Sequence, residues 1–367
     1  MYHINEIELD FEPRNKVLQK LPSGAESHIE MSNFDSGFLC GLLKKFKPKK
    51  ILELGVAEGG TTSIILQCLE DLNYDYEMHS VDIMTKWFDG VNHVGHLAGI
   101  AKKSLNVKNH QFHLGGGITF HLNEIGKDFD FVILDTSHFL PGELLDFLVV
   151  INILKEDAVI CMHDICCHQM NADLIKHATG VLFSTVTAEK YLNFIPSEMQ
   201  LSQWCFPRIS GFTYPNIGAF QITKQTKDNI LDLFCALMLR WKYMPPISEM
   251  DNYNKFIHQT YDEAACKIYD EAVKSNSYNL NVEDKYQILK FIPRRSKVFI
   301  LSDQQSIFDY INENHLELEI LSQQNAGYSE YIVIAFQNLA TVIEFESRLI
   351  HSGFNKKNII KILTGKY

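Results

Sequence analysis

Residues 51–62 read Ile51-Leu52-Glu53-Leu54-Gly55-Val56-Ala57-Glu58-Gly59-Gly60-Thr61-Thr62, an apolar run followed by a row of small residues. The apolar run predicts a short buried strand, and the pattern after it predicts a helix that continues to Leu72. Small residues at Gly55, Ala57 and Gly59 let the backbone of the intervening turn approach a ligand closely. The start of the helix adds N–H groups that have no partner within the helix. This segment therefore predicts a strand–turn–helix unit with a ligand site at its turn.

The turn departs from two common phosphate-binding patterns. It lacks the Gly-Lys-Ser/Thr ending of a phosphate loop, and its glycines do not follow the Gly-x-Gly-x-x-Gly spacing of dinucleotide sites. Twenty-nine residues after Glu53, a second predicted strand reaches Asp82, where a carboxylate can accept hydrogen bonds from both hydroxyls of a ribose. An ordinary tight turn between a strand and a helix is the alternative, and the position of Asp82 argues against it.

Apolar runs and helical patterns alternate along the following chain. Strands are predicted over residues 78–83, 110–114, 129–134 and 158–162, and helices over 33–46 and 142–154. Strands that are apolar throughout and separated by helices indicate a parallel sheet with helices on both faces, a Rossmann-like α/β fold. Residues 180–187 and 218–223 are expected to supply closing strands. Residues 1–33 are polar, and Pro13 and Pro22 are expected to interrupt any helix there.

A second region begins near Pro245 and Pro246. Apolar positions between residues 253 and 273 form one helical stripe, and strands and helices alternate again from Lys297. The turn at 302–305 has no glycine, so packing, oligomerisation or presentation of a substrate is expected there rather than cofactor binding. The predicted organisation is an N-terminal extension (1–33), a large α/β domain (34–245), a helical connector (246–295) and a small C-terminal α/β domain (296–367).

Composition excludes several classes of protein. The 367 residues are 46% hydrophobic and 22% charged, enough to bury at least one full core. The net charge of −11 argues against a nucleic acid as partner. No apolar run approaches the roughly 18 residues of a membrane span, and the first residues lack the pattern of a signal peptide. Eight scattered cysteines, several in apolar segments, fit a reducing compartment, so we expect a cytoplasmic protein.

Four polar residues with catalytic potential follow two of the predicted strands. Asp135 and His138 come after the strand at 129–134, and His163 and Asp164 after the strand at 158–162. Ligands of open α/β sheets bind outside the carboxyl ends of the strands, so all four are expected at the binding edge. One aspartate alone would be explained as a helix cap, but four residues together favour a functional cluster.

The segment from Glu53 to Thr61 resembles motif I of the class I S-adenosylmethionine-dependent methyltransferases. The resemblance implies that the methionine part of the cofactor lies against this turn and that further contacts come from the strand ends. The cofactor-binding residues implied are Glu53, Gly55, Ala57, Gly59, Thr61, Asp82, Gly117, Ile118 and Asp135. The family often carries an acid near the adenine amine after its third strand, whereas this chain reads Gly115-Gly116-Gly117-Ile118, so backbone groups and Ile118 are expected to hold adenine.

Residues 35–225 also resemble a narrower family, the metal-dependent O-methyltransferases of macrolide-bound sugars, rhamnosyl groups and cephalosporin-type scaffolds. The resemblance makes Asp135 and Asp164 metal ligands and His138 the general base, and it puts His163 where the family has Glu or Asp. Imidazole suits Mn²⁺, Fe²⁺ or Zn²⁺ better than Mg²⁺, which prefers oxygen. Either His163 ligates a softer metal, or it turns aside from Mg²⁺, or it assists His138 without any metal; Mg²⁺ or Mn²⁺ is the first expectation.

The resemblance implies an S-adenosylmethionine-dependent O-methyltransferase that methylates a hydroxyl of a sugar or glycoconjugate. One alternative is a metal-independent methyltransferase acting on nitrogen or on the oxygen of a small phenol. Another is a non-catalytic module in which the C-terminal domain mediates assembly, and the intact motif from Glu53 to Asp82 argues against it. The expected partner is a small-molecule or glycan acceptor, and the appended domain suggests a homo-oligomer.

Overall fold

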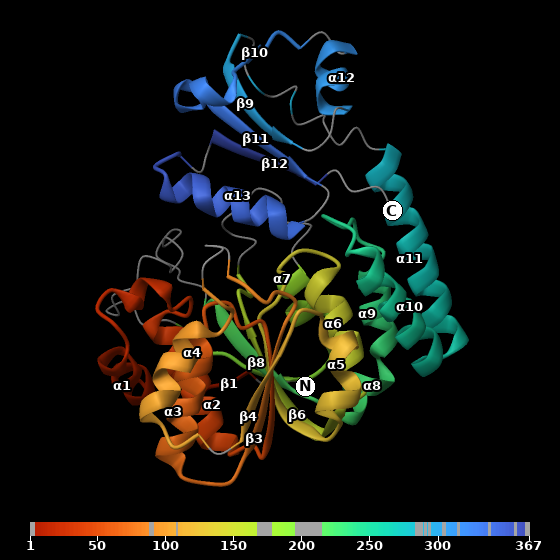
Figure 1. Ribbon diagram of the computed structural model, residues 1–367. Coiled ribbons are helices and arrows are strands. Elements are labelled where there is room, and N and C mark those ends of the chain that lie inside the picture. Colours follow the sequence, from red (N-terminus) through yellow and green to blue (C-terminus); the bar gives the residue numbers. More distant parts are fainter. Residues whose placement is uncertain are drawn as a thin grey trace. The chain divides into compact units, whose positions relative to one another are not determined.

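A mostly parallel sheet organises the first of two compact units in the computed structural model (Figure 1). The structure describes residues 4–87, 92–107, 109–166, 178–194, 215–282, 289, 292, 295–302, 306–313, 316–336, 339–355 and 358–363. The first unit includes Asn92–Asp270 together with the chain before Trp87, and the second unit begins at Glu271. In the part of the chain so described, no helix is both long enough and apolar enough to cross a membrane.

The large sheet contains eight strands among the described residues, in the order β1-β7-β8-β6-β5-β2-β3-β4. Their bounds are Ile4–Asn5 (β1), Lys50–Leu54 (β2), Glu77–Asp82 (β3), His110–Leu114 (β4), Phe129–Leu134 (β5), Leu154–His163 (β6), Glu189–Tyr191 (β7) and Ile217–Gln221 (β8). Strands β2 to β6 run parallel, and β8 is antiparallel to both β6 and β7. Since β2 lies between β3 and β5, the carboxyl ends of β2 and β5 border the crevice where sheets of this kind bind ligands.

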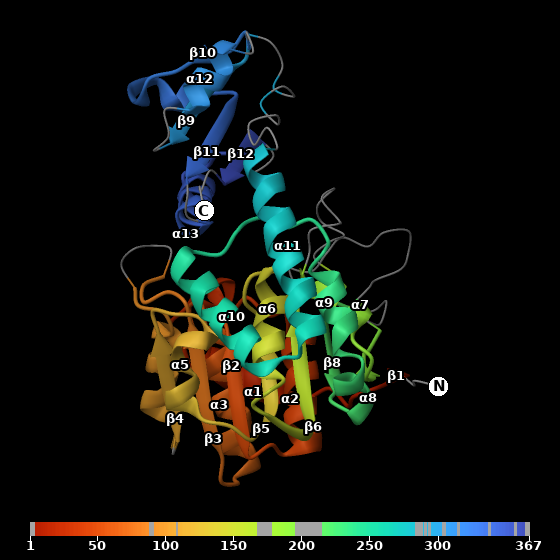
Figure 2. The same ribbon diagram turned by 90° about the vertical axis from the view of Figure 1, so that its right-hand side faces the viewer.

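Helices cover both faces of this sheet, as the sequence predicts (Figures 1 and 2). One layer contains α1 (Glu12–Lys20), α2 (Asn33–Phe46), α3 (Gly60–Leu72) and α4 (His96–Ala101). The other contains α5 (Ile118–Ile125), α6 (Gly142–Val150), α7 (Ala178–Thr185), α9 (Ile230–Ala236) and α10 (Ile247–Thr260), with α8 (Lys224–Asp228) beside α9. The Rossmann-like fold class is thereby confirmed.

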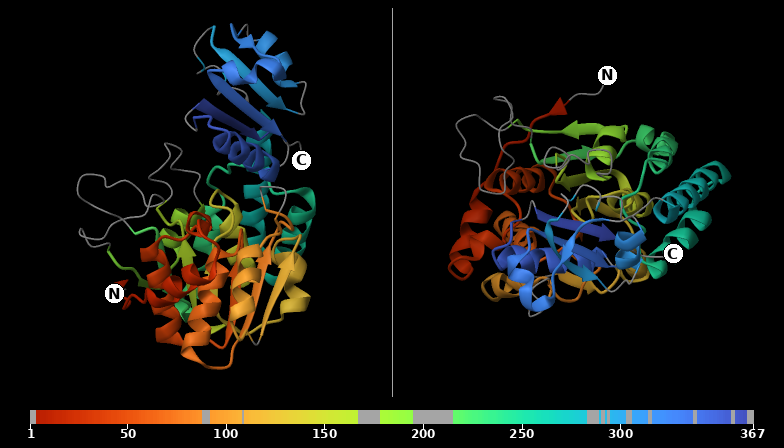
Figure 3. Two further views of the ribbon diagram at one scale, coloured as in Figure 1. Left: turned by 60° about the vertical axis from the view of Figure 1, so that its left-hand side comes forward. Right: turned by 90° about the horizontal axis from the view of Figure 1, so that it is seen from above.

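The second unit has its own parallel sheet, drawn in blue in Figure 3. Its strand order is β10-β9-β11-β12. Its elements are β9 (Lys297–Ser302), α12 (Ser306–Glu313), β10 (Glu319–Ile320), β11 (Tyr331–Phe336), α13 (Leu339–His351) and β12 (Ile359–Leu363). Ile307 and Ile311 of α12 join the apolar cluster on one face of the sheet, and Val342 of α13 joins the cluster on the other. Helix α11 (Glu263–Val282) crosses the division between the units.

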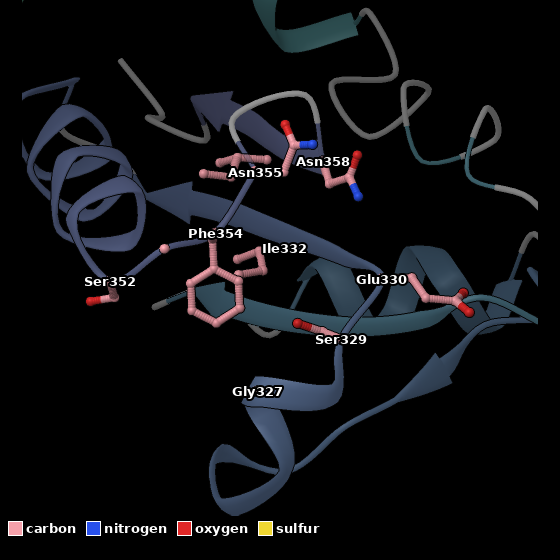
Figure 4. Close-up of a pocket in the computed structure, with 10 residues that line it drawn as sticks. Gly327, Ser329, Glu330, Ile332, Ser352, Phe354, Asn355 and Asn358 are labelled. Atoms are coloured by element: carbon pink, nitrogen blue, oxygen red, sulfur yellow. The ribbon is translucent and has the colours of Figure 1, made fainter.

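A hollow of about 420 Å³ opens at the amino ends of β11 and β12 in this small unit (Figure 4). Its polar lining is used within the fold: Ser329 and Ser352 donate to carbonyl oxygens of their own turns, and Glu330 accepts from the amide of Lys297. Because ligands of such sheets bind at the carboxyl ends of strands, this hollow lies at the opposite edge.

Three local predictions are wrong, each for a physical reason. Of residues 180–187, expected as a strand, 180–185 belong to helix α7 (Ala178–Thr185), since a short apolar run does not distinguish a buried strand from a buried helix. Residues 1–33 contain helix α1, because Pro13 lies in its first turn, where a missing N–H costs nothing. The single stripe over 253–273 is two helices, α10 and α11, because Tyr261 is extended and the carboxylate of Asp262 accepts the amide of Ala265 to start α11.

We predict that Gly55→Ala is far more destabilising than Gly24→Ala, although both glycines have φ of +89°. Gly24 has open space around it, so an alanine there should cost about 1–2 kcal/mol from the left-handed backbone alone. At Gly55 the added Cβ would lie 1.8 Å from the carbonyl oxygen of Asp135, so the backbone must move as well. Urea unfolding of the two variants compares these costs, and equal losses of stability would contradict the close approach.

Candidate active site

The turn after β2 has the backbone conformation of a tight ligand-binding loop. Gly55, Ala57 and Gly59 all have positive φ, at +89°, +50° and +88°. The amide of Gly55 donates to the carbonyl of Val81 at 3.0 Å, and the amide of Asp135 donates to Leu54 at 2.9 Å. The turn is therefore fixed between the ends of β3 and β5, on the carboxyl side of the sheet.

The carboxylate of Asp82 holds this turn against the end of β3. Oδ2 accepts the amides of Val56 and Ala57 at 2.9 and 3.1 Å, and Oδ1 accepts the amide of Met84 at 2.8 Å. Burial raises the pKa of Asp82, while the three amides favour its charged form. A carboxylate has about four acceptor positions, so Asp82 keeps capacity for a further donor at the binding edge.

Glu53 lies beneath the turn and is completely buried. Its carboxylate accepts the hydroxyls of Thr62 at 2.9 Å and Ser80 at 2.5 Å, and so links β2 to α3 and β3. Burial raises the pKa of Glu53 to about 8. These contacts give Glu53 a positioning role, and direct contact with a cofactor stays a prediction, as it does for the half-buried Thr61.

A carboxylate from a distant helix reaches the loop after β4, where the sequence has no acid. Oε1 of Glu249, on α10, accepts the amide of Gly117 at 2.9 Å. Its Oε2 is buried and has no hydrogen-bond partner among the described residues. A Cβ on Gly117 would lie 2.7 Å from that oxygen, so the approach depends on the glycine. Ile118, the predicted adenine neighbour, is buried at the start of α5.

The four polar residues at the ends of β5 and β6 form one cluster. Nε2 of His138 lies 3.0 Å from Oδ2 of Asp164 and 4.0 Å from Oδ1 of Asp135. Nδ1 of His163 lies 3.6 Å from Oδ2 of Asp135 and 3.5 Å from Oδ2 of Asp164. The topology of the sheet thus brings together the residues that the strand ends predict, and their roles stay predictions.

Three polar side chains that sequence analysis missed orient this cluster. Glu143 Oε1 lies 3.1 Å from Nδ1 of His138, and Asp35 Oδ2 lies 3.5 Å from Nε2 of His163. Asn216 donates from Nδ2 to Oδ1 of Asp164 at 2.7 Å, which holds the left-handed residue Asp164 (φ +58°) in place. The partners come from α6, from the capping box of α2 and from the residue before β8.

Charge compensation within the cluster is strong. Burial lowers the pKa of His163, but the carboxylates of Asp164 and Asp135 outweigh it and raise that pKa well above its ordinary value. Burial also lowers the pKa of His138, but Asp164 and Glu143 outweigh burial and raise that pKa well above its ordinary value. Conversely, the two imidazoles hold the pKa of Asp164 well below its usual range despite burial. The cluster is thus arranged to hold positive charge between its carboxylates.

A comparison with known proteins finds one family that part of this chain resembles. Residues 52–165, from β2 to the end of β6, match the family described as a methyltransferase domain. No curated protein matches the sequence. The matched segment contains both the turn after β2 and the cluster after β5 and β6, so the part of the chain that carries the candidate site is similar to a methyltransferase domain.

Several solved structures are similar to this chain at low identity. One is an O-methyltransferase from Bacillus cereus in complex with SAH (15% identity, 58% of this chain and 92% of that one, TM-score 0.40). Another is TomG from Streptomyces achromogenes, an O-methyltransferase involved in tomaymycin synthesis, in complex with SAM (14% identity, 59% and 92%, TM-score 0.39). A putative O-methyltransferase from Klebsiella pneumoniae is a third (13% identity, 58% and 87%, TM-score 0.37).

We predict that Glu53→Gln changes how stability depends on pH. The unfolded chain ionises Glu53 near pH 4.3, whereas the folded chain keeps its proton to about pH 8. Wild-type stability from this group is therefore complete below the unfolded pKa and is lost as pH rises toward 8. Glutamine does not ionise and has no such loss. The free energy of unfolding of the variant, measured in urea, should therefore rise relative to that of wild type from pH 5 to pH 8. Exposed Glu263→Gln is the control, and parallel stability curves for Glu53→Gln and wild type would contradict a buried neutral carboxyl group.

Proposed function

We propose that this chain is an S-adenosylmethionine-dependent methyltransferase that methylates oxygen, namely a hydroxyl of a sugar or glycoconjugate. In this proposal Asp135, His163 and Asp164 bind a divalent metal ion, and His138 is the general base. The observation that carries the proposal is the cluster of two imidazoles and two carboxylates beside the turn after β2. A Cβ on Gly55 would lie only 1.8 Å from the carbonyl oxygen of Asp135. The predicted cofactor turn and the acid–base cluster are therefore neighbours along one edge of the sheet.

The donor atoms of Asp135, His163 and Asp164 fit a divalent cation. One ligand atom from each lies within 4.8 Å of the others. With Nε2–H of His163 donating to Asp35, Nδ1 keeps a lone pair that faces two carboxylate oxygens. That arrangement is unfavourable unless a proton or a cation lies between these atoms. Two oxygens and one imidazole nitrogen suit Mn²⁺ or Fe²⁺ better than Mg²⁺, and a bound ion would lower the pKa of an acceptor hydroxyl and fix its orientation.

His138 is suited to accept the hydroxyl proton. Glu143 Oε1, which also accepts the amide of Thr136 at 3.1 Å, accepts a hydrogen bond from Nδ1–H of His138 and leaves Nε2 as the basic nitrogen. The side chain of His138 keeps 30% exposure, and its Nε2 lies 3.0 Å from Oδ2 of Asp164. In the neutral imidazole this nitrogen can therefore take the hydroxyl proton and then donate a hydrogen bond to Asp164. When bound, S-adenosylmethionine supplies a methyl group activated by its sulfonium, and the protein holds and deprotonates the acceptor.

The two alternatives differ from this proposal in measurable ways. A metal-independent methyltransferase would need His138 and Glu143 without a cation, and a non-catalytic module would need neither. The metal-independent reading is favoured by one observation, namely that a protonated His163 also satisfies the surrounding carboxylates. Metal dependence of turnover therefore separates the metal-assisted proposal from the metal-independent alternative.

We predict methyl transfer from labelled S-adenosylmethionine to members of a panel of glycosides, with phenols and amines as the competing acceptors. Chelation should abolish transfer, and Mn²⁺ should restore it at least as well as Mg²⁺. His138→Ala should lower turnover by about 10²–10⁴-fold, the usual contribution of a general base, without weakening cofactor binding. His258→Ala, which removes an exposed histidine paired with Asp270, is the matched control.

Each part of the proposal has its own contradicting result. Transfer to phenols or amines alone would exclude a sugar acceptor. Turnover that survives both chelation and Asp164→Asn would establish the metal-independent alternative. Turnover of His138→Ala equal to that of His258→Ala would remove His138 from the mechanism.

A further inference from the structure

We propose that His113, His121 and Glu124 form a second metal site, for a divalent transition metal such as Zn²⁺, that ties β4 to α5. None of these residues belongs to the cluster after β5 and β6. The site would join the edge strand of the sheet to the helix that follows it. It also adjoins the predicted cofactor site, since β4 and α5 flank the loop that contains Gly117.

The three side chains converge from two elements. Oε2 of Glu124 lies 3.0 Å from Nδ1 of His113 and 3.3 Å from Nδ1 of His121. One ligand atom from each of the three lies within 4.8 Å of the others. His121 and Glu124 are three residues apart on α5, so they project from the same face of that helix. No backbone rearrangement is needed to bring these donors to one cation.

A hydrogen-bond count along the neighbouring side chains points to a missing positive charge. Glu77, His79, His113 and Glu124 form a row with contacts of 2.7, 2.9 and 3.0 Å. Each of the three contacts needs one proton, but two neutral imidazoles carry two. Suppose that one proton lies between His79 and Glu77 and the other between His113 and His79. Nδ1 of His113 then presents a lone pair to the carboxylate of Glu124. A cation bound between these atoms and His121 resolves the conflict.

The same row defines which atoms would bind the metal. In this arrangement Nε2–H of His113 donates to Nδ1 of His79, and Nε2–H of His79 donates to the carboxylate of Glu77. Metal-ligating histidines typically donate their second ring N–H in this way. Two imidazole nitrogens and one carboxylate oxygen form a ligand set of zinc sites, with water in the fourth position. Calcium and magnesium prefer oxygen ligands throughout. The carboxylate of Glu124 is 61% exposed, so a metal can enter from solvent.

The test titrates Zn²⁺ into the full-length chain after a chelator has removed any bound metal. The background protein carries Asp164→Asn, which weakens metal binding at the cluster after β5 and β6. We expect one Zn²⁺ per chain by calorimetry and a melting temperature that rises with Zn²⁺ concentration. His121→Ala should weaken Zn²⁺ binding by at least about 10-fold. His258→Ala should leave binding unchanged, since His258 pairs with Asp270 on α10 and α11.

A second variant guards against misfolding. If His121→Ala melts early without metal, Glu124→Gln replaces it, because Glu124 is mostly exposed and should tolerate the change. Zn²⁺ binding that is equally tight in these variants and in the background protein would overturn the proposal. Absence of micromolar Zn²⁺ binding by the folded background protein would overturn it as well, and an extra proton on the imidazole row would then account for the geometry.

Discussion

The close approach of Gly55 to the carbonyl oxygen of Asp135 determines how the two halves of the site meet. The turn after β2 requires a left-handed backbone at Gly55, and Asp135 at the end of the neighbouring strand β5 leaves no room for a Cβ atom. One consequence is that the predicted cofactor turn lies directly beside the first residue of the acid–base cluster. Another is that Asp82 can close the turn from the opposite side, through the amides of Val56 and Ala57.

Helix α10 adds a constraint from outside the sheet. Glu249 accepts the amide of Gly117 in the loop after β4. One turn further along, Tyr253 donates to Asp146, whose other oxygen accepts the hydroxyl of Thr136 in the loop after β5. A single helix thus contacts one loop at the binding edge directly and is linked to a second through Asp146. Because buried polar groups that lose a partner cost free energy, movement of α10 would disturb both loops together.

Much of the fold follows from local pattern, and part of it does not. The apolar run at 129–134 predicts β5 at its observed bounds, the strand predicted over 110–114 coincides with β4, and the apolar spacing after Ser32 predicts α2. Helix α7 is missed because a short apolar run does not by itself separate a helix from a buried strand. Helix α1 is missed because Pro13 is read as a breaker, although it lies in the first turn. The predicted domain boundaries stay predictions.

The candidate site divides in the same way. Asp135, His138, His163 and Asp164 are found from sequence because parallel strands bring their carboxyl ends to one edge. Their supporting partners are not, since Asn216 lies 52 residues from Asp164, and Asp35 lies 128 residues from His163. No local spacing encodes such pairs. Asp35 alone has a local signal, the Ser32-x-x-Asp35 capping box, and that signal predicts a helix start rather than a catalytic neighbour.

The central claim is that the turn between β2 and α3, closed by Asp82, binds S-adenosylmethionine. Calorimetric titration of the cofactor into the full-length protein and into Asp82→Asn tests it most directly, with Asp228→Asn on the exposed helix α8 as control. We expect micromolar binding by wild type and by the control, and loss of binding in Asp82→Asn while its melting temperature shows a folded protein. Equal binding by folded Asp82→Asn, or no binding by folded wild type, would contradict the account.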